Sequence, residues 1–173
     1  MRIAIKRYVL GLVLVAAIAA FTFSTTTLAG GKGKNNCWMT GGGSVFDVNG
    51  SLIEYSGRTT HGFVVHCDPR NSDNLQINWK GNRFHMTDLN NAICDDDPAL
   101  TPESPDAQFD TFIGMGTGRL NNARGATVWF KFTDDGQPGV GDFAHIIISD
   151  PGGDVVLDVE GYLTFGNHQA HSN

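Results

Sequence analysis

Apolar and polar residues alternate along most of the chain after residue 43, with the two-residue period of half-buried β-strands. Phe63 and Val65, for example, share one face of their segment, and Val64 takes the other. No window of a dozen residues holds helical periodicity. The pattern predicts strands over 44–48, 51–54, 61–67, 75–79, 84–86, 109–120, 126–132, 143–149, 155–160 and 162–165, with a polar tail after the last.

Turn residues separate these segments. Asn49-Gly50 is typical of a two-residue hairpin loop, and Pro151-Gly152-Gly153 is typical of a second hairpin. Short strands at this spacing predict an all-β, antiparallel single domain, either a β-sandwich or barrel-like. The inward faces are expected to form the core with Phe63, Val65, Leu75, Ile77, Phe84, Val128, Phe130, Phe132, Ile147 and Leu157.

The first 29 residues have the layout of a secretory signal peptide. Arg2, Lys6 and Arg7 precede an apolar run over 8–23, and Ala29 ends the segment with a small residue. An uncleaved N-terminal anchor is the alternative, although the run is short for a membrane span. The expected division is a signal peptide at 1–29, a flexible leader at 30–39 and a β-domain at 40–171.

The net negative charge of the chain restricts the classes of partner that it is expected to bind. The chain has 18 acidic against 12 basic residues, a net charge of −6, and three of the bases lie in the signal peptide. An acidic surface repels nucleic acid and anionic membranes. We therefore expect a secreted protein, extracellular or periplasmic, that binds no nucleic acid and does not insert into a membrane once the signal is cleaved.

Three cysteines allow three single pairings. An oxidising compartment favours a disulfide and leaves one cysteine over. Cys67–Cys94 is the favoured pair, since both lie well inside the domain and Cys37 lies near its start. No C-x-x-C occurs, which argues against a redox motif or a zinc ribbon.

A glycine-rich loop with Asp134, Asp135 and Asp142 is a candidate calcium site. Calcium takes six to eight oxygen ligands, and such a loop supplies carboxylates and backbone carbonyls. The spacing is not that of an EF-hand, and the alternative is a turn whose acids bond nearby backbone. We expect the turn, with no cofactor. His168 and His171 have a spacing usable for a divalent metal, but they fall in the expected tail.

No motif for catalysis is present: the chain lacks G-x-S-x-G, H-E-x-x-H, a P-loop and a dinucleotide fingerprint. Trp129 lies on the polar side of its strand and is a candidate binding residue, because an exposed aromatic ring can stack on a sugar or a partner protein. The expected function is a non-catalytic module that binds a protein or a glycan. The alternative is a secreted, glycan-directed hydrolase whose site the sequence hides.

Several short motifs follow one another along the chain: TGGG at 40–43, HGF at 61–63, NLQ at 74–76, FTDDGQPG at 132–139 with Asp142, and GNHQAH at 166–171. Their order resembles that of the secreted bacterial post-COAP domains, which follow choice-of-anchor modules. The resemblance implies an extracellular β-rich module and transfers no activity. Gln137 stands where the family usually has Glu, and His168 where it has an apolar residue. No anchor module is evident, so the chain would be a stand-alone copy.

Overall fold

The computed structural model describes residues 36–46, 57–100 and 107–172, and these ranges form one antiparallel sheet of nine strands. The all-β prediction is confirmed. The strands are β1 (Cys37–Phe46), β2 (Arg58–His66), β3 (Asn74–Trp79), β4 (Asn82–Asp95), β5 (Thr111–Leu120), β6 (Ala123–Thr133), β7 (Phe143–Ser149), β8 (Val155–Tyr162) and β9 (Phe165–Ser172).

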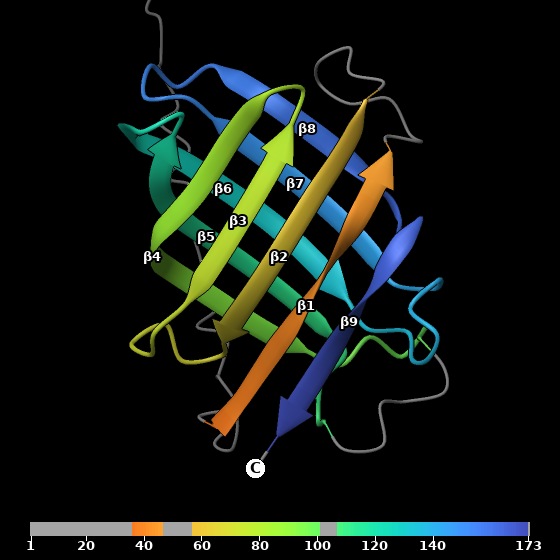
Figure 1. Cartoon of the computed structure of the whole chain (residues 1–173). Coiled ribbons are helices and arrows are strands. Elements are labelled where there is room, and N and C mark those ends of the chain that lie inside the picture. The colour runs from red at the N-terminus through yellow and green to blue at the C-terminus, as the bar shows by residue number, and fades with distance from the viewer. Residues whose placement is uncertain (1–35, 47–56, 101–106, 173) are drawn as a thin grey trace, which may run out of the picture.

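Each strand from β1 to β7 pairs with the next along the chain, and β9 returns to pair with β1. The sheet curls over on itself, so that β9, β1, β2 and β3 form a front layer and β5 to β8 cross behind it (Figure 1). The long strand β4 takes part in both layers. Its register shifts between Met86 and Asp88 and again between Leu89 and Asn91. Such bulges bend a strand, which allows β4 to form the corner.

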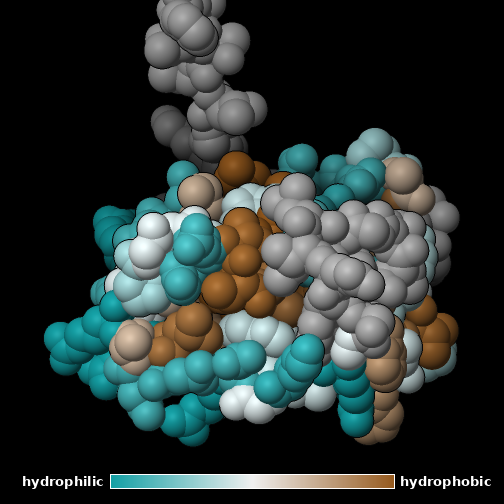
Figure 2. All heavy atoms as spheres, turned by 90° about the horizontal axis from the view of Figure 1, so that it is seen from above, coloured by the Kyte–Doolittle hydropathy of each residue, from teal (hydrophilic) through white to brown (hydrophobic). Residues whose placement is uncertain are grey.

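The core lies between the two layers and is rich in aromatic rings. Phe63 from the front layer stacks on Phe132 from the rear, with ring centroids 4.3 Å apart. In the end-on view, apolar atoms gather in the middle and hydrophilic atoms line much of the rim (Figure 2). Every predicted core residue is buried except Ile147. That prediction was wrong: Ile146 and Ile148 face the core, and Ile147 faces outward opposite Trp129.

The C-terminal segment is a strand, which corrects the expectation of a polar tail. Strand β9 pairs with β1 from Cys37 opposite Ser172 to Ser44 opposite Phe165, and it buries His168 and Ala170. The same pairing starts β1 at Cys37, inside the leader expected at 30–39. Backbone pairing thus orders the C-terminal strand, although few of its side chains are apolar.

Some predictions fall outside the described residues, namely the signal peptide and the hairpin at Asn49-Gly50. Within the described ranges, no helix is long and apolar enough to cross a membrane.

Candidate functional site

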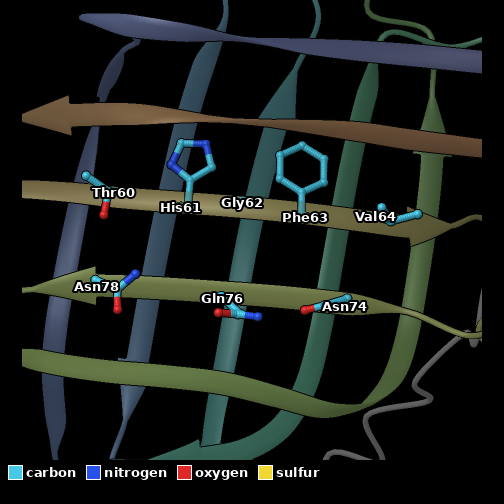
Figure 3. Close-up of a pocket in the computed structure, with 8 residues that line it drawn as sticks. All are labelled: Thr60, His61, Gly62, Phe63, Val64, Asn74, Gln76 and Asn78. Carbon is cyan, nitrogen blue, oxygen red and sulfur yellow. The ribbon is translucent and has the colours of Figure 1, made fainter.

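A groove of about 440 Å³ lies on the outer face of the front layer, over β2 and β3. Alternate residues of a strand point to opposite faces, so β2 sends His61 and Phe63 into the core and turns the residues between them outward. In Figure 3 the outward side chains of β2 and β3 follow one another along neighbouring strands. The groove is lined by Thr60, His61, Gly62, Phe63, Val64, Asn74, Gln76 and Asn78.

Gly62 lies between the outward side chains of Thr60 and Val64, opposite Gly42 on β1 and Gln76 on β3. It has no left-handed backbone conformation, and a Cβ at this position would meet no atom within 4 Å. A glycine inside a strand costs about 0.5–1 kcal/mol relative to alanine. Neither backbone nor packing therefore requires this glycine, and its effect is to leave the groove open.

Three amide side chains of β3, those of Asn74, Gln76 and Asn78, line one side of the groove and are exposed. None of them makes a side-chain hydrogen bond with another described residue. Each amide presents two donors and one acceptor, and alternate positions on a strand lie about 7 Å apart. The groove thus offers a row of uncommitted donors and acceptors.

Basic side chains continue this face beyond β3. Arg83 is the register partner of Asn78, and His85 is the partner of Gln76. On the next strands Arg119 lies opposite His85, and Arg124 lies opposite Arg119. All are exposed, as is Lys80 in the β3–β4 turn. We call Lys80, Arg83, Arg119 and Arg124 the basic strip. No strip residue forms an ion pair with a carboxylate of the described ranges.

A buried histidine pair lies beneath the groove. The Nε2 atoms of His61 and His168 are 2.8 Å apart, and His168 Nδ1 lies 2.9 Å from the carbonyl oxygen of Thr133. A carbonyl only accepts, so Nδ1 of His168 carries a proton and its Nε2 accepts from the N–H of His61. Burial lowers the pKa of His61 to about 3 and that of His168 to about 4. Both imidazoles are therefore neutral at physiological pH.

The loop proposed for calcium holds the free edge of β9. Asp142 accepts the backbone N–H of His168 at 2.6 Å and that of Asp135 at 2.8 Å. Asp134 accepts the N–H of Ala170 at 2.8 Å. Strand β9 pairs with β1 along its other edge only. On the free edge, these carboxylates accept N–H groups that would otherwise bond to a neighbouring strand. Burial raises the pKa of Asp142 to about 6, against its hydrogen bonds.

Calcium binding at this loop stays the untested alternative to a turn without a cofactor. Asp134 and Asp142 are buried and use carboxylate oxygens for backbone N–H groups, whereas Asp135 is half-buried. In the part of the chain that the structure describes, no three or more His, Cys, Asp or Glu side chains form a group able to hold a metal ion.

Trp129 lies on the outer face of the rear layer, away from the groove. It is half-buried and packs edge-to-face on His145, with ring centroids 5.0 Å apart. His145 Nε2 in turn lies 2.9 Å from a carboxylate oxygen of Asp158. Beside Trp129 is a smaller depression of about 200 Å³, lined mainly by Met115, Ile147 and nearby polar residues. The structure does not bring Trp129 together with the loop aspartates, which lie in a separate place.

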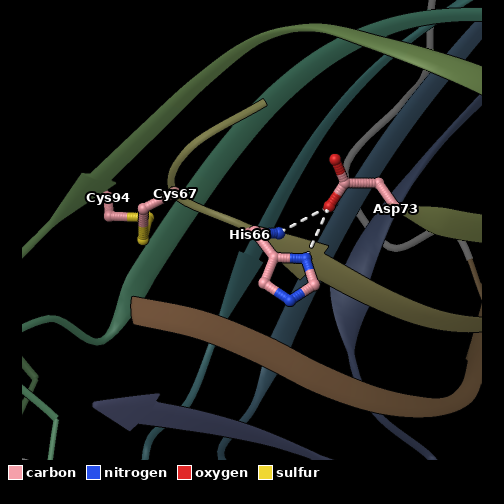
Figure 4. The surroundings of a disulfide bond; sticks show 4 residues. All are labelled: His66, Cys67, Asp73 and Cys94. Carbon is pink, nitrogen blue, oxygen red and sulfur yellow. Dashed lines mark hydrogen bonds and ion pairs between the residues drawn. A yellow bond between two sulfur atoms is a disulfide. The ribbon is translucent and has the colours of Figure 1, made fainter. Parts of the chain in front are cut away.

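The predicted disulfide is confirmed. Cys67 and Cys94 are bonded, with Cα atoms 5.8 Å apart, and the bond joins the end of β2 to the end of β4 (Figure 4). Beside it, Asp73 accepts hydrogen bonds from the backbone N–H and Nδ1 of His66. Cys37 is a buried cysteine outside this disulfide.

Comparison with known protein families, curated proteins and solved structures finds no match for this chain. The resemblance to post-COAP domains therefore stays a prediction. The groove was not identified from the sequence, although the alternation already turns Gln76 and Asn78 outward. The available signal was Gly62, a glycine in the middle of an otherwise regular strand pattern.

Proposed function

We propose that this chain is a secreted, non-catalytic binding module and that the groove over β2 and β3 is its binding site. The observation that carries the proposal is Gly62, a strand glycine that neither a positive φ nor a close contact requires. Keeping a destabilising residue at an open position makes physical sense if a ligand occupies the space above it. The disulfide supports export, because such bonds persist in oxidising compartments.

The lining supports binding rather than catalysis. Its outward side chains carry hydroxyl, amide and aliphatic groups, and none of the eight lining residues is acidic or a cysteine. The imidazole of His61 is buried on the core side of β2, so it does not serve the groove as a base. Amide groups that both donate and accept are suited to ligands rich in hydroxyl or carbonyl groups, as in a glycan or a peptide backbone.

The proposal is tested by nitrogen–proton correlation NMR on ¹⁵N-labelled protein, which observes the side-chain NH₂ groups of Asn74, Gln76 and Asn78 directly. The probes are N-acetylglucosamine, galacturonate and an acetylated dipeptide amide. At least one probe is expected to shift these resonances in the wild type and to leave them unshifted in Gly62→Val. The new side chain fills the groove floor without meeting another atom at its Cβ position.

Thr127→Val is the matched control, since Thr127 is exposed on the outer face of the rear layer. This variant should respond to the probe as the wild type does. The proposal is overturned if no probe shifts the three amides, or if Gly62→Val responds as strongly as the wild type. Shifts that gather around Trp129 instead would move the site to the rear face.

A further inference from the structure

The distribution of positive charge indicates what the groove binds. The protein is acidic overall, with 18 acidic against 12 basic residues. The basic strip nevertheless gathers four cations on neighbouring turns and strands, with no carboxylate of the described ranges paired to any of them. In contrast, the exposed Arg70 makes a bidentate pair with Asp68. Unpaired, mutually repelling cations on an acidic protein are suited to an external anion.

The strip is continuous with the groove. Across the sheet, Gly62, Gln76, His85 and Arg119 occupy successive register positions on β2, β3, β4 and β5. Neighbouring strands lie about 4.8 Å apart, so Arg119 is about 10 Å from Gln76 across the sheet. Arg83 is closer still, as the direct partner of Asn78. A ligand in the groove that extends toward β4 and β5 therefore meets guanidinium groups next.

We infer that the ligand is an acidic glycan, a chain of hydroxyl-bearing rings with carboxylate groups, which lies across β2 to β5. This inference rests on the proposed function of the groove. Ring hydroxyls face the amides of Gln76 and Asn78, and a carboxylate faces Arg83 and Arg119, whose planar guanidinium groups match it in a bidentate manner. The mixed lining accounts for both groups, whereas an anion without hydroxyls would leave the amides unused.

A glycan also fits the overall charge better than nucleic acid does. Double-stranded DNA carries one charge per about 1.7 Å of its axis, and the surrounding acidic surface repels so dense a polyanion. A glycan with one carboxylate per sugar ring is charged more sparsely. Its carboxylates can meet the strip while the neutral groups between them contact the uncharged groove.

The experiment measures binding of the protein to polygalacturonate, alginate and hyaluronate by affinity electrophoresis and calorimetry at low and high salt. At least one of these chains is expected to bind, and added salt should weaken the binding. Arg83→Gln/Arg119→Gln should weaken it at least tenfold. The control Arg70→Gln/Lys131→Gln removes the same charge from positions outside the strip and should bind within about twofold of the wild type.

Two further ligands separate the inference from the proposed function. The methyl ester of the bound glycan, which keeps the rings and masks the charges, should bind at least tenfold more weakly, and poly-glutamate should not compete. Failure of all three glycans, equal binding of the ester, competition by poly-glutamate or insensitivity to the strip variant would each overturn the acidic-glycan assignment. None of these results would affect the groove, whose test is the response of Gly62→Val to the NMR probes.

Discussion

The domain is expected to lose stability as the pH falls from about 7.5 to about 5, because the buried pair His61–His168 must stay neutral. The folded-state pKa values of His61 and His168 are about 3 and about 4, below the ordinary histidine pKa of 6.5. Between these limits the unfolded chain binds more protons than the folded one. The stability that this neutral pair retains above about pH 6.5 is therefore lost as acid is added.

Protonation of Asp142 stabilises the folded state as the pH falls, so the net change in stability depends on the size of each contribution. At about pH 5, proton binding by the unfolded chain lowers the free energy of unfolding by about 2 kcal/mol per histidine, or about 4 kcal/mol for the pair. The pKa of Asp142 rises from 3.8 to about 6 on folding, so the folded state takes up this proton first. This contributes about 1 kcal/mol of stability at the same pH. The net loss is about 3 kcal/mol, which corresponds to about 6–12 °C in Tm for a domain of this size.

Urea unfolding followed by tryptophan fluorescence at several pH values measures this loss. The matched variant is His61→Gln, because an amide can still donate to Nε2 of His168 but does not titrate. Asp142 still titrates in this variant, so its net loss should be about 1 kcal/mol between the same pH values, about a third of the wild-type loss. A wild-type stability that is constant or rises on acidification would refute the reasoning, as would an unchanged pH dependence in His61→Gln.

Four further outcomes follow from individual sites in the structure. Asp142→Ala removes the acceptor of two backbone N–H groups and should cost about 3–6 kcal/mol in urea unfolding, since bonds to charged groups contribute about 1.5–3 kcal/mol each. Added calcium or chelator should leave the wild-type Tm unchanged, and a calcium-dependent rise would restore the metal hypothesis. Cys67→Ser/Cys94→Ser opens a loop with a sequence separation of 27 and should cost about 3–4 kcal/mol, measured against the oxidised wild type. Gly114→Ala places a methyl group against the ring of Phe130 and should cost about 1–3 kcal/mol, whereas an unaffected Tm would show that the ring moves freely.

Alternation predicted the strands well where one face is apolar and the other polar. Strand β7 has the predicted bounds, and β3 and β6 begin and end within a few residues of theirs. The method failed at Ile147, because three successive isoleucines give no phase from which to decide which of them faces inward. The register with β6, which a local pattern does not contain, places Ile147 opposite the outward Trp129 and its two neighbours opposite core residues.

The C-terminal strand shows the same limit more clearly. The segment from Phe165 to Ser172 has few apolar residues, and its order depends on partners more than a hundred positions away in β1 and on Asp134 and Asp142. His168 can be buried because Thr133 and His61 satisfy both of its ring nitrogens. The hydrogen-bond partners of these polar groups are distant in the sequence and come close only in the folded protein. A local sequence pattern therefore predicts that these residues are exposed to solvent.

Strand β2 contributes one face to the core and the other face to the groove. The groove therefore has a packed support, and the sequence pattern of β2 indicates the core more clearly than the groove. In β2, His61 and Phe63 stack beneath the groove on Phe132, with centroids 5.1 and 4.3 Å from that ring. The outward residues between them are thus held on a packed, hydrogen-bonded support, and a ligand need not order a loop in order to bind. Core packing requires apolar residues at the inward positions, and these produce the alternating pattern in the sequence. On the proposed function, the outward residues are constrained by the ligand. Among the described strand residues, Gly62 is the position where that constraint would oppose strand stability.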